Sequence, residues 1–340
     1  MWDFGAGLHV HWSKAVFTAS TLHDNVADDK GGAVLASNYS VVTAYSDVII
    51  SGNTAGTDGG GIYLIRQTWV ELNSSSVLNN LASTGGGIAA YGGVRITLNN
   101  SEVARNQGYL SGGGISLMQL CSLSIFRSMV VENIAGSDGG GIFVYERSEL
   151  QVSNCTLGSN EAGNGGSIAL YFESSLVLSS HSTIFSSLVT GNGGAIWLNE
   201  RSRAVINDTL MEANNAGGGN GGHFFLTTNS SVEMSDAVLI RGDALHMGGA
   251  VYANKGALVR LRRTHIAMNH AENGAGLFLD MYASAVVEEA FIFLNLAELH
   301  GGGGLVWADC TLTMRGSQVM GCAAKWHREV QTSGGGILVK

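Results

Sequence analysis

The sequence of 340 residues contains no proline, where about 5% would be average. Proline cannot donate a backbone hydrogen bond and is confined to strand edges and bulges, so a chain of continuously paired strands has few places for it. Charged residues make up only 13% of the chain, and the net charge is −9. This acidic balance argues against nucleic acid as a partner. No run of 18 apolar residues occurs, so no membrane span is predicted.

Cysteine is also scarce, and the spacing of Cys121, Cys155, Cys310 and Cys322 is not that of a zinc site. Cys310 and Cys322 fall in one repeat and could form a disulfide across it, but buried free thiols are the favoured interpretation. Neither a signal peptide nor a polar capping segment is evident, although solenoids need caps for solubility. This predicts either a piece of a longer chain or ends that stack on neighbouring molecules.

Glycine, in contrast, is abundant and recurs in runs at a regular interval. Eleven intervals between Gly5 and Gly302 cover 297 residues, an average of 27. Residues three and five positions after each first glycine are apolar in every copy, such as Ile62 and Leu64. Residues two apart lie on one face of a strand, so each run predicts a buried strand. The first glycines are Gly5, Gly31, Gly59, Gly85, Gly112, Gly139, Gly165, Gly193, Gly221, Gly248, Gly274, Gly302 and Gly334.

The copy aligned on Gly302 places Leu305 and Trp307 in the two buried columns. The interval from Gly302 to Gly334 is longer than the others and is the one that departs from the period.

A second motif, an apolar residue, two spacers and Asn, follows at a constant distance after each first glycine. Stacked Asn side chains can bond to one another and to turn backbone, so a structural ladder is favoured over a binding role. In three copies Ser187, Asp243 and Cys322 replace Asn. The ladder residues are Asn25, Asn53, Asn80, Asn106, Asn133, Asn160, Asn214, Asn269 and Asn295.

A third alternating run, such as Val70-Glu-Leu72, lies between the two motifs. Each copy therefore predicts three short strands and three turns, without a helical period. The predicted fold is all-β: a right-handed parallel β-helix of about twelve coils of ~27 residues, in which equivalent positions stack. A single solenoid is expected to fill residues 1–340.

The two motifs resemble the repeats of the chlamydial polymorphic outer membrane proteins, which are marked by GGA[ILV] and FxxN. The first motif is matched by GGAV at Gly31, GGAI at Gly193 and GGAV at Gly248. In the second, Val, Leu or Ile mostly takes the place of Phe. The resemblance covers essentially the whole chain and implies a surface-exposed passenger with adhesive roles.

The position four residues after the first glycine is predicted to point outward, between the two buried columns. Together with small neighbours, aromatic residues there would form a flat apolar strip. Such a strip favours an interface; stiffening of the outer face and carbohydrate stacking are the alternatives. The aromatic residues are Tyr63, Phe143, Trp197, Phe225, Tyr252 and Phe278.

N-linked glycans are predicted from six N-x-S/T sequons. Four of their asparagines have nearly the same phase in the repeat, so glycans would coat one corner in a eukaryotic secretory pathway. The sequons lie at Asn38, Asn73, Asn99, Asn154, Asn207 and Asn229.

The strongest enzyme-like pattern is Glu146, Glu173 and Glu200 in three consecutive coils. Stacked carboxylates there could hold Ca²⁺ or an acidic sugar. Exposed ion pairs with the adjacent Arg147 and Arg201 are the favoured interpretation. No general-base pair is identifiable, so no catalytic residue, cofactor or metal is predicted. The insertion at 323–333 carries Trp326, which is expected to be either a contact residue or part of a surface loop.

The sequence thus predicts a non-enzymatic extracellular or cell-surface structural protein, a glycosylated β-helical rod that self-associates into a fibre or filament. One alternative is an adhesin-type passenger that binds a receptor or glycan through the aromatic strip or Trp326. Another is a polysaccharide lyase or hydrolase that acts through Glu146, Glu173 and Glu200.

Overall fold

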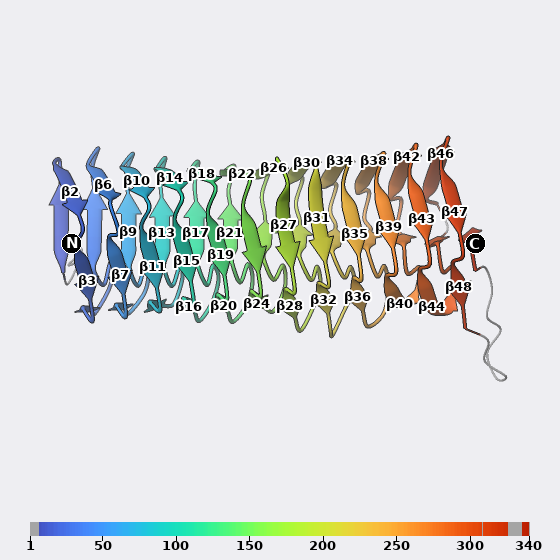
Figure 1. Ribbon diagram of the computed structural model, residues 1–340, viewed down its shortest axis with the longest axis horizontal. Helices are drawn as coiled ribbons and strands as arrows, with labels where there is room; N and C mark the ends of the chain where they lie inside the picture. The colour runs from blue at the N-terminus through green and yellow to red at the C-terminus, as the bar shows by residue number, and fades with distance from the viewer. Residues whose placement is uncertain (1–6, 308, 326–334, 340) are drawn as a thin grey trace. The chain divides into compact units, whose positions relative to one another are not determined.

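The computed structural model describes residues 7–307, 309–325 and 335–339. It is an all-β parallel solenoid of about twelve turns (Figure 1), so the predicted fold class is confirmed. No helix among the described residues is long and apolar enough to cross a membrane.

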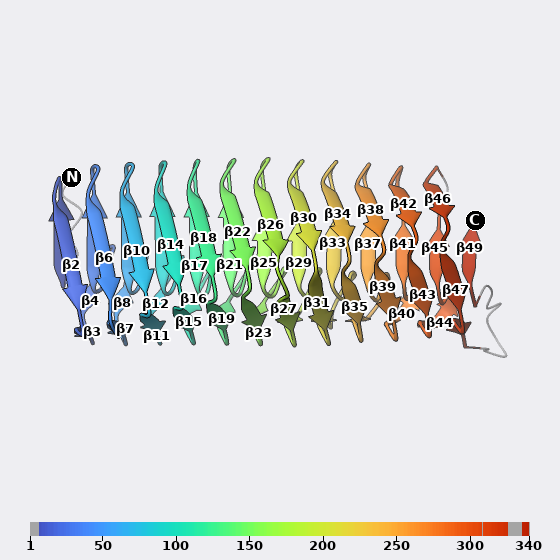
Figure 2. The same ribbon diagram turned by 45° about the horizontal axis from the view of Figure 1, so that its top comes forward.

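Two compact units make up the chain. Unit 1 contains 1–163, 167–169 and 173–176, and unit 2 contains 164–166, 170–172 and 177–340. Within each unit every turn contributes one strand to each of four parallel sheets, and equivalent strands of successive turns lie side by side (Figure 2). Two strands, β25 (Ile168–Leu170) and β26 (Ser175–Ser179), contain residues of both units.

Sheet 1 follows the glycine runs. In unit 1 it contains β1 (Leu8–His11), β5 (Val34–Ser37), β9 (Ile62–Ile65), β13 (Ile88–Tyr91), β17 (Ile115–Met118) and β21 (Ile142–Tyr145). In unit 2 it contains β29 (Ile196–Leu198), β33 (Phe224–Leu226), β37 (Val251–Ala253), β41 (Leu277–Leu279), β45 (Gly304–Val306) and β49 (Ile337–Val339).

Sheet 2 is formed by the third alternating run of each turn. In unit 1 it contains β2 (Lys14–Thr18), β6 (Val41–Tyr45), β10 (Trp69–Asn73), β14 (Arg95–Asn99), β18 (Ser122–Phe126) and β22 (Glu149–Ser153). In unit 2 it contains β30 (Arg203–Asn207), β34 (Ser231–Ser235), β38 (Leu258–Arg262), β42 (Ser284–Glu288) and β46 (Thr311–Arg315).

Sheet 3 leads into the asparagine motif. In unit 1 it contains β3 (Thr21–His23), β7 (Ile49–Ser51), β11 (Ser76–Leu78), β15 (Glu102–Ala104), β19 (Met129–Val131) and β23 (Thr156–Gly158). In unit 2 it contains β27 (Ser182–Phe185), β31 (Thr209–Glu212), β35 (Val238–Ile240), β39 (His265–Ala267), β43 (Phe291–Phe293) and β47 (Gln318–Met320).

The prediction of three strands per coil is wrong, because a fourth short strand follows each asparagine motif. These strands form sheet 4. In unit 1 it contains β4 (Val26–Ala27), β8 (Thr54–Ala55), β12 (Leu81–Ala82), β16 (Gln107–Gly108), β20 (Ile134–Ala135) and β24 (Glu161–Ala162). In unit 2 it contains β28 (Leu188–Val189), β32 (Asn215–Ala216), β36 (Asp243–Ala244), β40 (His270–Asn273), β44 (Leu296–His300) and β48 (Ala323–Ala324).

The fourth strand forms because the residue after each asparagine bonds to the turn before it. The Thr54 N–H donates to the Asn25 carbonyl at 2.9 Å, and the Leu81 N–H donates to the Asn53 carbonyl at 2.9 Å. The next residue is small and buried, as at Ala55 and Ala82. Most of these strands have only two residues, too few for an alternating apolar pattern to reveal them in the sequence.

Inward side chains of sheets 1 to 3 form a continuous apolar core within each unit. In one turn Ile62, Leu64, Val70 and Val77 are completely buried. Burying one such side chain stabilises the fold by about 1.5–3 kcal/mol. Because the same columns recur at each turn, the predicted buried strands are confirmed for the described turns between Val34 and Leu279.

The register at the last glycine run differs from the prediction. Phe278 pairs with Leu305, and Leu279 pairs with Val306. Leu305 therefore occupies the outward column, and Trp307 is 44% exposed. Four consecutive glycines precede Leu305. The first glycines of the other described runs have a left-handed backbone, and in this run Gly301 has that conformation, with φ +65°. Sequence alone did not distinguish Gly301 from Gly302.

The glycine runs meet two different requirements. Gly59 has φ +67°, a left-handed conformation that L side chains rarely adopt, and its Cβ would meet the backbone of Ile62 and Tyr63. Gly61 has a different role, because a Cβ there would lie 3.2 Å from Nδ2 of Asn80. The run thus provides a tight turn and leaves room for the ladder asparagine of the same repeat.

The asparagine ladder of unit 1 is present as predicted and is buried from Asn53 onward. Asn53 Nδ2 donates to Asn80 Oδ1 at 2.9 Å, and Asn80 Nδ2 donates to Asn106 Oδ1 at 3.0 Å. Each Oδ1 also accepts a backbone N–H, as Asn106 Oδ1 does from Asn80 at 3.0 Å. The same side-chain bond joins Asn25 to Asn53, Asn106 to Asn133 and Asn133 to Asn160.

In unit 2 the ladder contains a substitution that the sequence did not predict. Asp243 pairs with Asn215, so the residue level with Asn214 is Gly242 rather than Asp243. The space that an asparagine side chain would occupy at position 242 is filled by His223. His223 replaces the third glycine of its run and is completely buried. Its Nδ1 lies 3.1 Å from Asn214 Nδ2. The ladder continues from Asn269 to Asn295 at 2.9 Å, and Asn295 Nδ2 lies 3.8 Å from Cys322 Sγ.

Candidate functional site

The aromatic row that was predicted to be exposed is buried. Phe143 is 9% exposed, Phe225 8% and Tyr252 5%, and the fractions at Tyr63 and Phe278 are lower. Trp197 is half-buried and packs edge-on against Phe225. The prediction of an exposed interface strip is therefore wrong, because five of the six positions are buried and Trp197 is half-buried.

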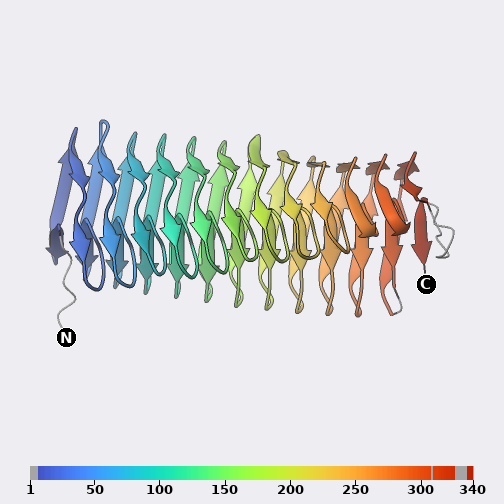
Figure 3. The ribbon, with the colours of Figure 1, turned by 90° about the horizontal axis from the view of Figure 1, so that it is seen from below.

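Figure 3 shows the backbone of the successive turns and the loops between their strands. Residues of the loops that join sheet 4 to sheet 1 pack against the row. Lys30 Nζ lies 4.8 Å from the centre of the Tyr63 ring and 3.3 Å from its hydroxyl. Met247 packs against the cluster of Phe225, Tyr252 and Phe278. The outward aromatics thus form a second apolar layer. Sequence reasoning missed the residues that cover it, Lys30 and Met247, each of which lies just before a glycine run.

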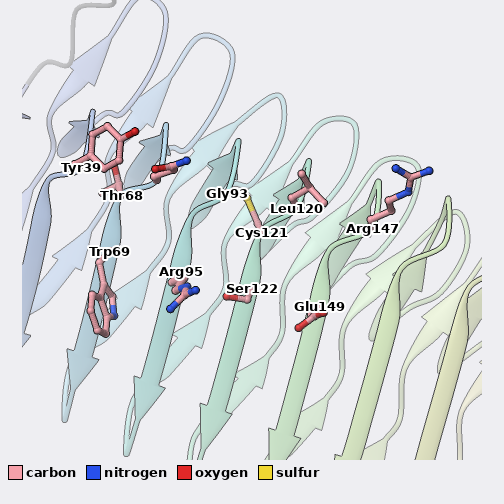
Figure 4. A pocket seen from close by; sticks show the side chains of 11 residues that line it. Tyr39, Thr68, Trp69, Gly93, Arg95, Leu120, Cys121, Ser122, Arg147 and Glu149 are labelled. Carbon is pink, nitrogen blue, oxygen red and sulfur yellow. The ribbon is translucent and has the colours of Figure 1, made fainter.

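An exposed groove lies instead on the outer face of sheet 2 in unit 1. The groove has a volume of about 610 Å³ and lies between two rows of side chains (Figure 4). One row comes from the turns between sheets 1 and 2: Tyr39, Gln67, Gly93, Leu120 and Arg147. The other comes from the first residues of consecutive sheet 2 strands: Trp69, Arg95, Ser122 and Glu149, which are in register.

A glycine pair opens the groove at its centre. Turn residues at this position have left-handed backbone even when they carry long side chains, as at Gln67 with φ 57° and Leu120 with φ 58°. Between them lie Gly92 and Gly93, and the nearest atom to a Cβ at Gly93 would be Gln67 Cγ, 3.4 Å away. The missing side chains leave a gap in the upper row at Gly93, between Thr68 and Leu120 (Figure 4).

The aromatic end of the groove differs chemically from its centre and its other end. Tyr39 and Trp69 are 59% and 54% exposed, and Tyr39 stacks on Trp12 with ring centres 5.2 Å apart. Arg95 and Glu149 are exposed, and neither forms an ion pair with a described residue. They are two strands apart, roughly 10 Å, too far to pair with each other. The groove therefore offers two aromatic surfaces, the guanidinium groups of Arg95 and Arg147, and a carboxylate to a ligand.

The floor of the groove is closed by buried polar residues. Thr68 and Cys121 are each 1% exposed, and Thr68 Oγ1 donates to the Ile65 carbonyl at 2.7 Å. Burial raises the pKa of the Cys121 thiol, so it stays protonated at neutral pH. The floor is inert, and recognition chemistry is confined to the two exposed rows.

Comparison with known proteins agrees with this architecture. A model of right-handed β-helix regions matches residues 6–179, just over half of the chain. The chain belongs to the right-handed β-helix family. No curated protein and no solved structure matches the chain. Because folds of this kind host many functions, the function of this β-helix must be argued from its sites.

The three glutamates singled out in the sequence do not form a metal site in this β-helix. The described residues contain no group of three His, Cys, Asp or Glu side chains that could hold a metal ion. Arg147 Nε donates to Glu173 Oε2 at 2.8 Å. Glu146 and Glu200 both lie in left-handed turn positions, with φ 52° and 50°. Glu173 therefore forms an ion pair with Arg147, in agreement with the favoured interpretation.

The sequon asparagines lie mostly at one corner of the β-helix turn. Asn73, Asn99 and Asn207 end their sheet 2 strands, and Asn154 follows directly after β22. Asn154, Asn207 and Asn229 are exposed, whereas Asn38, Asn73 and Asn99 are half-buried. Glycosylation of these residues stays a prediction.

The described cysteines are all free thiols, so the possible bond between Cys310 and Cys322 is not formed. Cys121 and Cys155 are buried, as the favoured interpretation predicted, while Cys310 and Cys322 are half-buried. Trp326 lies outside the described residues.

A charged cluster on sheet 4 of unit 2 was not recognised in the sequence. His270 Nδ1 lies 2.8 Å from Asp243 Oδ1, and His270 Nε2 lies 2.7 Å from Glu298 Oε1. Lys325 Nζ pairs with the same Glu298 oxygen. Burial lowers the pKa of His270, but hydrogen bonds to Glu298 and Asp243 outweigh it, so the pKa is raised overall.

A raised pKa has a defined consequence for stability. The protonated form of His270 is favoured by folding, so its stabilisation is complete below about pH 6.5 and is lost as pH rises through the raised pKa. We expect His270→Gln to lower the urea midpoint of unfolding at pH 5 and to change it little at pH 9. Equal effects at both pH values would contradict this assignment.

Proposed function

We propose that this β-helix is a non-enzymatic, extracellular binding scaffold of adhesin type, and that the unit 1 groove holds a glycan. The observation that carries the proposal is the groove itself, which brings Trp69, Arg95 and Glu149 together on one exposed face. Each residue has a counterpart in the chemistry of a sugar chain. Exposed aromatic rings pack against the apolar face of a sugar ring, while the guanidinium and carboxylate bond to its hydroxyl or carboxyl groups.

The direction of the groove supports a chain-like ligand. Its lining residues come from five successive turns, and neighbouring turns are ~4.8 Å apart, so it extends on the order of 20 Å across the strands. A ligand that follows the rows meets the aromatic end, then Arg95 below the Gly93 gap, then Glu149. A pocket for a small compact ligand would close around it, whereas this groove is open along one side, as Figure 4 shows.

The likeness to the chlamydial polymorphic outer membrane protein repeats supports surface exposure and adhesion, and it is offered here as part of the proposal. Glu149 is the one carboxylate among the residues that line the groove. Hydrolysis of a glycosidic bond ordinarily uses two carboxyl groups on either side of the bond. This composition favours binding over the lyase or hydrolase alternative.

Assembly into a fibre stays a prediction from the sequence. The strip expected to be its seam is covered by loop residues, so Tyr63, Phe225 and Tyr252 offer no surface for a second copy. The groove, in contrast, is accessible in a single chain.

Glycan-array binding followed by calorimetry tests the proposal. We expect the protein to bind a subset of unsulfated chains, and Trp69→Ala and Arg95→Gln each to weaken binding at least ~10-fold, the usual effect of losing a central contact. Tyr282→Asn is the matched control, because Tyr282 is 71% exposed and lies in unit 2. Circular dichroism establishes that the variants fold.

Two results would overturn the proposal. Binding that is unchanged in both groove variants would place the ligand elsewhere. Release of new reducing ends or unsaturated sugars during incubation would favour the enzyme alternative.

A further inference from the structure

Unit 2 carries an excess of positive charge on one face of an otherwise acidic protein. The chain has a net charge of −9. On the five unit 2 strands of sheet 2, however, the outward positions contain four arginines and only two acidic residues. These are Arg203, Arg260, Arg262 and Arg315, with Glu233 and Glu288.

Four of these residues, Arg260, Arg262, Glu233 and Glu288, line a groove of about 470 Å³. Its floor is made by outward side chains of β30, β34, β38 and β42, including Val205, Ser235 and Val286. Every arginine named above is exposed. The groove is separate from the unit 1 groove in sequence and in composition, because no aromatic side chain lines it.

Ion pairing accounts for only part of the guanidinium charge. Glu233 is shared, with Arg203 Nη2 at 3.1 Å from Oε2 and Arg260 Nη1 at 2.9 Å from Oε1. Glu288 Oε1 is occupied by Arg315 Nη1 at 3.0 Å.

Arg262 lies between Ser235 and Glu288 in the register of the sheet and forms no ion pair with a described residue. Its guanidinium, together with the unused N–H groups of Arg260, is available to an anion. Guanidinium groups bind sulfate and carboxylate through paired hydrogen bonds, which a lysine cannot reproduce.

From this arrangement we propose that the unit 2 groove is a second binding site, for a sulfated polysaccharide. A sulfated polysaccharide alternates anionic groups with hydroxyl donors. The groove alternates in the same way, with Arg260 and Arg262 for sulfate groups and Glu233 and Glu288 as acceptors for hydroxyls.

Single-stranded nucleic acid fits less well. Proteins that bind it stack bases on aromatic side chains and track a continuous row of phosphates. The groove has no aromatic lining, and its two carboxylates would repel evenly spaced phosphates. Nucleic acid is therefore the competing outcome of the test.

The test uses the full chain and immobilised heparin, with unsulfated dextran and single-stranded DNA as comparison probes. We expect binding to heparin that weakens with salt, no binding to dextran, and weaker binding to DNA. Arg262→Gln should reduce heparin affinity ~3–10-fold, and Arg260→Gln with Arg262→Gln at least ~10-fold. Arg241→Gln, which removes a charge that is paired with Glu212 outside the groove, should leave affinity within about two-fold.

The outcomes separate this site from the unit 1 groove. Trp69→Ala should bind heparin as well as the unaltered protein does, whatever it does to the ligand of unit 1. Loss of heparin affinity in Trp69→Ala but not in the Arg260/Arg262 variant would overturn the proposal. So would an Arg241→Gln effect as large as that of Arg262→Gln, which would indicate unspecific attraction, or tighter binding to DNA than to heparin.

Discussion

Replacing Asn106 by leucine is expected to lower the free energy of unfolding by about 3–5 kcal/mol, because buried polar groups that lose their partners cost about 1–3 kcal/mol each. Asn106 Oδ1 accepts from both the backbone N–H and Nδ2 of Asn80, and its own Nδ2 donates to the Val77 carbonyl at 2.9 Å. Leucine has a similar shape but makes none of these bonds. All the partners are completely or almost completely buried, so water cannot replace the lost bonds.

Urea unfolding followed by circular dichroism measures the effect. Gln107→Ala is the control, because Gln107 is the exposed neighbour of Asn106 and should change stability by no more than about 0.5 kcal/mol. If Asn106→Leu and the control had similar midpoints, the ladder would not be a stabilising element of the turn.

The second large effect is expected at the histidine that interrupts the ladder of unit 2. A Cβ at Gly242 would lie 2.7 Å from His223 Cδ2 and close to the Gly249 carbonyl oxygen. Gly242→Asn should therefore destabilise the protein by overpacking, and His223→Gly should destabilise it by leaving a cavity. The double variant rebuilds the pattern of the other turns, with Asn in the ladder and Gly facing it. We expect it to be more stable than the sum of the two changes implies, by about 1–3 kcal/mol.

His223 also makes a pH-dependent contribution that the double variant lacks. Complete burial lowers the pKa of His223 to about 3. The unfolded chain takes up this proton near pH 6.5 and the folded chain does not, so stability falls as pH decreases from about 6.5 toward 3. The slope approaches about 1.4 kcal/mol per pH unit. The sign is opposite to that at His270, whose contribution is lost as pH rises.

Unfolding midpoints between pH 7 and pH 4 check this assignment. The unaltered protein should lose more stability over this interval than the double variant. A parallel decline in both proteins would show that His223 is not the titrating group. A double variant no more stable than additivity predicts would show that the histidine and the glycine are not coupled.

The repeat was sufficient to predict the fold, because its period equals one turn and a parallel stack places equal positions side by side. Ile62 and Leu64 could be assigned to the core, and Asn80 and Asn106 to one ladder, from phase alone. The same reasoning misassigned Leu305, because four glycines in a row leave the phase undetermined. It also missed Gly242, because the adjacent Asp243 resembles asparagine more closely than glycine does.

The candidate sites depended on a different kind of information. Phase predicts that Tyr63 points away from the core, but exposure depends on the path of the loops, and Lys30 from the loop of the preceding turn covers the ring. The groove at Trp69 and Arg95 arises because Gly93 has no side chain to cover it, which is apparent only once turns and strands are placed together. In the same way, Glu233 and Glu288 pair with arginines other than Arg262. These ion pairs join side chains of neighbouring turns, which are far apart in the sequence.

Sequence by itself thus determined the class of fold, the inward columns and the purpose of the glycine and asparagine motifs. The physical reason is that these features repeat at each turn and involve residues at equal positions. Tertiary structure alone decided which outward residues are exposed, where the grooves lie and which charges are paired. These properties arise from loops and side chains that differ between turns, so no repeating pattern encodes them.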